Sequence, residues 1–265
     1  DITEADDCAV TWDDGGKPMD LTSTFAAGTS TSPVVYPMSS DGTLTFCDGT
    51  WYVLLEIAAS NVTINSVNGA ANTTLSAAEK GAVITVSARG AMVQISGLTL
   101  TEGVGTYGGA VENNQPGTSL ALSNMTLDGN TGTYGGALYS DSGSLSLDTV
   151  TLSNNRATQG GGFYLVDSAM KGKDSFITGN SATEGGGIFA STAVASFQET
   201  EISGNSATQG GGFYGDDEGS LTMFCTATGG VFGNTASDAG GGAYSVLRGE
   251  NDTTACDWGT AKTSD

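Results

Sequence analysis

The sequence contains no histidine, and this absence removes the side chain that most often acts as a general base near neutral pH. The Ser-His and Cys-His pairs of nucleophilic enzymes and histidine-ligated zinc or iron sites are therefore excluded. Basic residues are also scarce, with 8 Lys and Arg against 29 Asp and Glu, which gives a formal net charge of −21. Phosphate binding needs clustered Lys and Arg, so we expect no nucleic-acid partner and no docking on anionic membranes.

Long hydrophobic runs and prolines are also missing. No segment approaches the ~20 apolar residues of a membrane span, so we expect no membrane insertion in this segment. Only 4 of the 265 residues are proline, which excludes collagen and proline-rich linkers. The chain begins Asp1-Ile2-Thr3, without Met or an apolar leader. We interpret it as a mature chain from which a signal peptide has been removed.

The four cysteines are Cys8 and Cys47 near the start and Cys225 and Cys256 near the end. They allow three pairings, and free buried thiols are an alternative. The acidic, lysine-poor composition, rich in Ser, Thr and Gly, favours disulfides in an exported protein. We expect one disulfide near each end of the molecule.

Glycine is abundant, at 41 residues, and much of it belongs to a repeat in the middle of the chain. Each copy has an Asn, a short polar segment, a Gly run and an apolar pair. The marker asparagines are Asn130, Asn155, Asn180, Asn205 and Asn234, spaced by 25, 25, 25 and 29 residues. Short segments with period-2 alternation, such as Met125-Thr126-Leu127, precede the copies and are typical of strands. No 3.6-residue periodicity supports a helical array.

Strands that recur every ~25 residues predict a solenoid. We predict an all-β protein built as a single right-handed parallel β-helix, with roughly eight coils stacked at ~4.8 Å. Residues 53–245 are expected to form the coils. Residues 1–52 and 246–265 do not repeat, and we expect them to cap the open ends, which would otherwise pair with other chains. The five marker asparagines are expected to form an inward ladder of amide hydrogen bonds.

The repeat resembles that of a known family. Ile177-Thr178-Gly179-Asn180 and Gly186-Gly187-Ile188 are similar to the paired FxxN and GGA[ILV] repeats of the chlamydial polymorphic outer-membrane proteins. The resemblance covers about residues 93–245 and implies a right-handed β-helix in a secreted or surface-exposed bacterial protein with adhesive roles. The sequence departs from the family because Leu or Ile replaces most FxxN phenylalanines, and because the C-terminal autotransporter barrel is missing.

An aromatic column is the candidate binding site. Neighbouring residues on a strand point to opposite faces, so the residues after the inward Phe163, Ile188 and Phe213 should point outward. The resulting column contains Tyr139, Tyr164, Phe189, Tyr214 and Tyr244. An exposed aromatic column is a stacking platform for a glycan or a surface protein. The alternative is that these rings only stabilise adjacent coils or are covered by the C-terminal extension.

Acidic residues recur just after that strand and are candidate metal ligands. They are Asp141, Asp167, Asp216, Asp217 and Glu218. Stacked carboxylates repel one another unless a cation such as Ca²⁺ lies among them. No calcium-loop motif is present, and a solvated acidic edge is the alternative. Two further acidic clusters, Asp6-Asp7-Asp13-Asp14 and Glu250-Asp252-Asp257, are candidate calcium sites at the caps. No cofactor is required by the sequence.

We expect an exported, non-catalytic surface protein that acts as an adhesin, an extracellular-matrix component or a recognition module. The alternative is a calcium-assisted polysaccharide lyase or a glycoside hydrolase on a β-helix scaffold. Such lyases use Arg or Lys as the base, whereas the eight basic residues here are scattered, and −21 charges would repel an acidic polysaccharide. Glycosidases need two carboxylates ~5–10 Å apart, and 29 acids will supply such pairs by chance.

Overall fold

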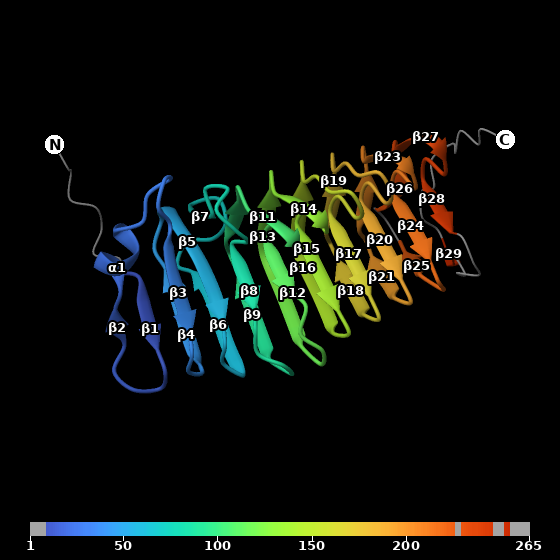
Figure 1. Ribbon diagram of the computed structural model, residues 1–265. Helices are drawn as coiled ribbons and strands as arrows, with labels where there is room; N and C mark the ends of the chain where they lie inside the picture. The colour runs from blue at the N-terminus through green and yellow to red at the C-terminus, as the bar shows by residue number, and fades with distance from the viewer. Residues whose placement is uncertain (1–8, 226–228, 246–251, 255–265) are drawn as a thin grey trace.

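The computed structural model describes residues 9–225, 229–245 and 252–254. The protein is 57 % strand and 2 % helix, folded as a β-solenoid of about 7 turns with about 25 residues per turn. Figure 1 shows the strands of successive coils lying side by side from helix α1 to strand β29. The predicted parallel β-solenoid and its period are confirmed, with about one turn fewer than expected.

Three parallel ladders run along the solenoid, and each coil contributes one strand segment to each of them. The first ladder contains β4 (Gly42–Phe46), β6 (Asn61–Ser66), β9 (Met92–Ser96), the first half of β13 (Ser119–Asp128), the first half of β16 (Ser144–Ser153), β18 (Ala169–Lys173), β21 (Val194–Gln198), β25 (Ser220–Phe224) and β29 (Asp252–Thr254).

The second ladder contains the start of β5 (Gly49–Ile57), β7 (Thr73–Ser76), β10 (Thr99–Thr101), the second halves of β13 and β16, β19 (Phe176–Thr178), β22 (Glu201–Ser203) and β26 (Gly230–Phe232). The third contains β3 (Val34–Met38), the end of β5, β8 (Ile84–Val86), β12 (Val111–Asn113), β15 (Leu138–Asp141), β17 (Phe163–Val166), β20 (Ile188–Ser191), β24 (Phe213–Asp216) and β28 (Ala243–Ser245).

The core is a set of aliphatic columns inside these ladders. In the second ladder the column of Leu100, Leu127, Leu152, Ile177, Ile202 and Val231 is in register from coil to coil and fully buried. Because each coil places the same type of residue at the same point, the buried apolar surface of one coil packs on that of the next.

A fourth, shorter set of strands lies between the second and third ladders. It contains β11 (Val104–Tyr107), β14 (Thr131–Tyr134), β23 (Ser206–Gln209) and β27 (Thr235–Ala239), and isolated bridges continue it through the coils between β14 and β23. The Gly runs that follow these segments make a sharp turn. Gly160 and Gly185 have φ values of +67° and +65°, and a Cβ at either position would overlap the backbone carbonyl three residues ahead.

The N-terminal segment joins the solenoid earlier than expected. Strand β1 (Thr11–Asp13) pairs antiparallel with β2 (Met19–Asp20) and β4, and the five-residue helix α1 (Thr22–Ala26) buries Phe25. The parallel ladders begin with β3 and β4, and β5 crosses the expected boundary after residue 52 without a break. At the other end β29 extends the first ladder into the predicted C-terminal cap. No helix in the described ranges is long and apolar enough to cross a membrane.

Candidate functional site

The aromatic column forms a continuous stack on the third ladder, but it is not the exposed platform that the sequence predicts. Successive ring centroids of Tyr139, Tyr164, Phe189, Tyr214 and Tyr244 are 5.4, 4.8, 5.1 and 5.1 Å apart, with interplanar angles of 25° or less. Only 7 % of Tyr139 and Tyr214 and 2 % of Phe189 are exposed. Tyr164 and Tyr244 are half-buried. The expectation that this column is exposed is therefore wrong, and its role in binding a ligand stays a prediction.

The turn that precedes each strand of the third ladder shields part of the aromatic column from solvent. The Gly135 turn folds back so closely that a Cβ there would overlap the backbone of Leu138. Tyr107 and Tyr134, which sequence reasoning missed, lie in this covering segment. The ring of Tyr107 is 4.8 Å from that of Tyr139, and the ring of Tyr134 is 5.2 Å from that of Tyr164.

The burial of the aromatic column raises the pKa values of three of its tyrosine phenols. Burial is the main cause that raises the pKa of Tyr164 to about 12, and it also raises the pKa values of Tyr139 and Tyr214. A phenol that is kept from water stays neutral over a wider pH range. The column therefore has the properties of a structural stack that joins consecutive coils.

The candidate metal ligands occupy two neighbouring columns. Asp141 and Asp216 share one column but stand three coils apart, with Val166 and Ser191 between them. Asp167 lies in the adjacent turn and accepts a hydrogen bond from Thr192 Oγ1 of the next coil at 2.5 Å.

The remaining two candidate ligands, Asp217 and Glu218, lie in the turn after β24, and both have positive φ. Within the described residues no group of three or more His, Cys, Asp or Glu side chains is placed to hold a metal ion. Calcium binding stays a prediction, which thermal unfolding with and without EDTA would test.

The predicted cap clusters are only partly described. Asp13 and Asp14 each accept a hydrogen bond from a backbone N–H two residues ahead. Asp6, Asp7, Glu250 and Asp257 lie outside the described residues, and the side chain of Asp252 is not described.

The asparagine ladder is present and connects the coils through the core. Asn180 Oδ1 accepts hydrogen bonds from the backbone N–H and the amide of Asn155, at 3.0 and 2.9 Å. The amide of Asn180 donates in turn to the Leu152 carbonyl and to Asn205. The same pattern runs through Asn130, Asn155, Asn180, Asn205 and Asn234. Because these amides are saturated by protein groups, the ladder holds the fold and offers no ligand site.

The outer surface of the first ladder differs from the rest of this acidic protein. We call it the charge-poor face, and define it as the outward residues from β9 to β25. These are Met92, Gln94, Ser96, Ser119, Ala121, Ser123, Ser144, Ser146, Asp148, Ala169, Lys171, Lys173, Val194, Ser196, Gln198, Ser220, Thr222 and Phe224. It carries one acid and two lysines, in a chain of net charge −21.

Many acids stand instead at the turns. Seven of them have positive φ, a conformation typical of tight turns and uncommon for residues other than glycine. They are Glu79, Glu102, Asp167, Asp174, Glu199, Asp217 and Glu218. Negative charge is thus carried along the corners of the solenoid, whereas the charge-poor face between them is close to neutral.

A groove of about 470 Å³ crosses the charge-poor face. It is lined on one side by Ser146, Lys171 and Ser196, which are in register on three successive coils. The other side is lined by Asp148, Lys173, Gln198 and Phe224, on four successive coils. These two rows run across the strands, so the groove follows the solenoid axis.

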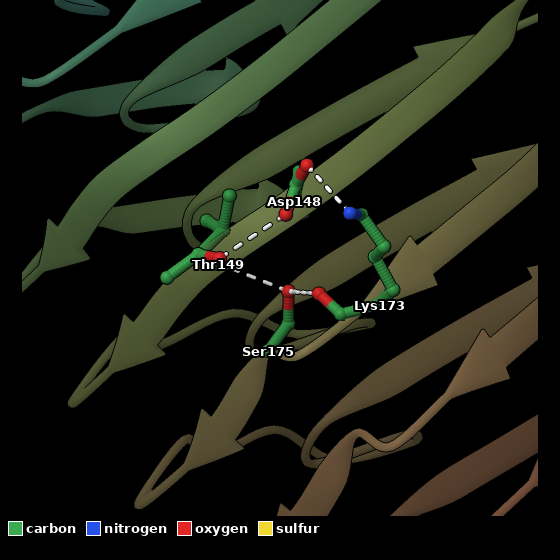
Figure 2. Close-up of polar contacts among 5 residues, drawn as sticks. Asp148, Thr149, Lys173 and Ser175 are labelled. Atoms are coloured by element: carbon green, nitrogen blue, oxygen red, sulfur yellow. Dashed lines mark hydrogen bonds and ion pairs between the residues drawn. The ribbon is translucent and has the colours of Figure 1, made fainter.

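Figure 2 shows the polar contacts at one wall of this groove. Lys173 Nζ of β18 lies 3.0 Å from Asp148 Oδ2 of β16, and Thr149 Oγ1 donates to the other carboxylate oxygen at 3.1 Å. The hydrogen bond from Lys173 is the main cause that lowers the Asp148 pKa, and the same bond raises the Lys173 pKa. Ser175 Oγ donates to the Lys173 carbonyl at 2.7 Å, which ties the next turn to this strand.

The cysteines are consistent with the expected disulfides without fixing their pairing. Cys47 and Cys225 are both buried, and no cysteine of the described part of the chain is a free thiol. Cys8 and Cys256 lie outside the described residues. The pairing of Cys8 with Cys47 and of Cys225 with Cys256 stays a prediction.

Comparison with protein-family models, with curated proteins and with solved structures gives no match for this chain. The resemblance to the repeats of the chlamydial polymorphic outer-membrane proteins therefore stays a prediction.

Proposed function

We propose that this protein is an exported, non-catalytic recognition module that binds a glycan through its charge-poor face. The observation that carries the proposal is the groove between two rows of side chains that follow the solenoid axis. Ser, Gln and Lys in these rows are hydrogen-bonding groups, and the exposed ring of Phe224 is a stacking surface at one end. A groove of this volume falls in the ~300–1,000 Å³ range of small-molecule sites.

The stiffness of the solenoid supports this role. A ligand that lies along the axis contacts several coils, and each coil is fixed to the next by parallel ladders and by the asparagine amides. The contacting groups are therefore held in place before the ligand arrives, which lowers the entropic cost of binding. The same binding surface would serve a protein that acts as an adhesin, as a matrix component or as a recognition module.

A glycan array probed with the full chain tests the proposal. We expect binding to a subset of glycans, and we expect the loss of that binding in Ser196→Asp, which adds a carboxylate to one of the two rows, next to Lys171. Ser119→Asp, on the same face but outside the groove, is the matched control and should bind normally. Failure to bind any glycan, or equal binding by Ser196→Asp, contradicts the proposal. Binding to cell-surface proteins but to no glycan, in a separate pull-down, would replace the glycan with a protein partner.

The enzyme alternative has a separate readout. A calcium-assisted lyase releases unsaturated products and a hydrolase releases reducing ends, so either activity would appear when the bound glycans are incubated with the protein. We expect neither product with or without added calcium. Export predicts disulfides, which peptide mass analysis before and after reduction would detect as the pairs Cys8–Cys47 and Cys225–Cys256.

A further inference from the structure

The centre of the groove is a place where the chain departs from its own repeat. In the first ladder one inward column contains Leu122, Leu147, Gly172, Phe197 and Met223, so glycine replaces a core side chain in a single coil. A Cβ on Gly172 would overlap the buried ring of Phe197. Lysines flank this glycine on the outer surface. The ring of Phe197 occupies the space beside this glycine, and the two lysines that flank it line the groove.

We infer that the groove binds a saccharide chain carrying a single carboxylate, with this group on the Lys171 ammonium and a sugar ring on Phe224. The inference depends on the proposed glycan-binding function and names the class of ligand. It follows from the charges in the groove, from the spacing of the two contact points and from the acidic surroundings.

Lys171 supplies an uncompensated positive charge. An ion pair joins Lys173 to Asp148 and neutralises the second lysine of the groove. Lys171 is exposed, and its neighbours across the strands are Ser146 and Ser196. Hydrogen bonds between an ammonium and a carboxylate are roughly twice as strong as those between neutral groups. One carboxylate of the ligand can therefore be recognised at this point.

The acidic corners argue against a polyanion. Asp167 and Asp174 stand in the turns at the two ends of β18, the strand that carries Lys171. A uniformly charged chain would meet these carboxylates as well as Lys171, and the net charge of −21 would oppose its approach. A ligand with one carboxylate gains the contact with Lys171 and avoids most of this repulsion.

The second contact point fixes a minimum ligand length. Phe224 lies two coils beyond Lys173 on the same row, through Gln198, and therefore about 10 Å along the axis. Its ring is 49 % exposed, an uncommon state for a phenylalanine without a partner. A sugar ring can pack its apolar face on this ring while Ser196 and Gln198 contact the intervening hydroxyls. The ligand must then contain more than one sugar.

Calorimetry on the full chain tests the inference with matched probes. The probes are tri- and tetrasaccharides that end in sialate or glucuronate, the methyl ester of each, and tetragalacturonate. We expect at least one acid to bind ten times more tightly than its ester, and tetragalacturonate to bind more weakly than this acid. Lys171→Gln should remove the difference between acid and ester, and Phe224→Ser should weaken both. Met92→Ser, an exposed position of the same face outside the groove, should change neither.

Three outcomes overturn the inference while leaving the proposed function intact. In the first, glycans bind but no acid binds more tightly than its ester. In the second, Lys171→Gln keeps the preference for the acid. Binding of tetragalacturonate more tightly than every singly charged probe would also overturn it, because the ligand would then be a polyanion. Absence of binding to all of these probes and to the glycan array contradicts the proposed function as well.

Discussion

The rings of Tyr164 and Phe189 lie parallel, with an interplanar angle of 3° and centroids 4.8 Å apart. This distance is the strand spacing of a β-sheet, so side chains at equivalent points of two coils are brought to stacking distance by the backbone alone. The stack is extended to Tyr139 on one side and to Tyr214 and Tyr244 on the other. It joins five coils on the outer face of the third ladder. The asparagine ladder joins the coils in the interior of the solenoid.

Phe189→Ala tests whether this stack stabilises the fold. The side chain is 2 % exposed, and its removal leaves a gap between two tyrosine rings. We expect a loss of about 3–5 kcal/mol in the free energy of unfolding, measured by urea denaturation followed by circular dichroism. Phe176→Ala is the control, since that ring is 49 % exposed, and it should cost less than about 1 kcal/mol. Equal effects of the two substitutions would contradict a structural role.

The raised phenol pKa values predict a loss of stability in alkali. An unfolded tyrosine ionises near pH 10, whereas burial raises the pKa of Tyr164 to about 12. The folded state therefore holds the proton more tightly than the unfolded state. The stabilisation is complete below about pH 10 and is lost as the pH rises toward 12. The free energy of unfolding should fall across this window, and less steeply in Tyr164→Phe.

Ultraviolet absorbance of the tyrosinate reports the same effect directly. We expect the phenols of Tyr139, Tyr164 and Tyr214 to titrate above the pH of about 10 that is usual for tyrosine, or only on unfolding. A single transition near pH 10 for all tyrosines of the folded protein would show that the stack is open to water.

Asn180→Ala tests the internal ladder. The substitution leaves the buried N–H of Asn155 and the buried carbonyl of Leu152 without the partners that Asn180 gives them. At about 1–3 kcal/mol for each buried group left unpaired, the expected cost is several kcal/mol. Asn72→Ala is the control, because Asn72 is exposed and donates one surface hydrogen bond to the Asn68 carbonyl. A melting temperature unchanged by Asn180→Ala would mean that water replaces the ladder at no cost.

Gly172→Ala tests the relationship between this glycine and the ring of Phe197. Replacing glycine by alanine in a strand normally stabilises it, by roughly 0.5–1 kcal/mol. Here the new methyl group would overlap the ring, and we expect a net destabilisation of about 1–3 kcal/mol. Gly81→Ala, where a Cβ would make an ordinary 3.5 Å contact with Leu54, should be tolerated.

A double-mutant cycle identifies the cause. Phe197→Leu removes the ring atoms that overlap the new methyl, so the combined variant should lose less than the sum of the two single variants. Additive effects would mean that Gly172→Ala acts through the backbone and not through Phe197.

The architecture could be predicted because the same residue pattern recurs in coil after coil. Each coil repeats the apolar positions at a period of 2 and the asparagine at a period of about 25, so registers such as Leu152 with Ile177 and Asn155 with Asn180 follow directly. The outward direction of Tyr164 followed from the same alternation. These features depend on local geometry that every copy shares.

The burial of the aromatic column could not be predicted in the same way. Outward direction on a strand does not decide exposure, which depends here on the path of the Gly135 turn and on Tyr107 and Tyr134. These two tyrosines are not repeated in later coils, where Gln159 and Glu184 stand at the equivalent points. A search for aromatic residues at other repeat positions could have found them.

The groove was missed for a related reason. Its walls come from coils that differ from one another, and Lys171 and Lys173 appear in a single copy. In the sequence alone, the two lysines cannot be distinguished from the other six basic residues, which are scattered along the chain. Only the register shows that they share a face almost free of acids.

Hydroxyl-radical footprinting of the full chain, with and without a saturating acid-terminated tetrasaccharide, tests the binding face most directly. Three exposed reporters, Phe224, Met92 and Phe176, are 49, 57 and 49 % exposed and lie at different places on the solenoid. The predicted result is protection of Phe224 alone, because it lines the groove while Met92 and Phe176 do not. Protection of the tyrosine column with Phe224 unchanged, or equal labelling at every site, would contradict binding at the charge-poor face.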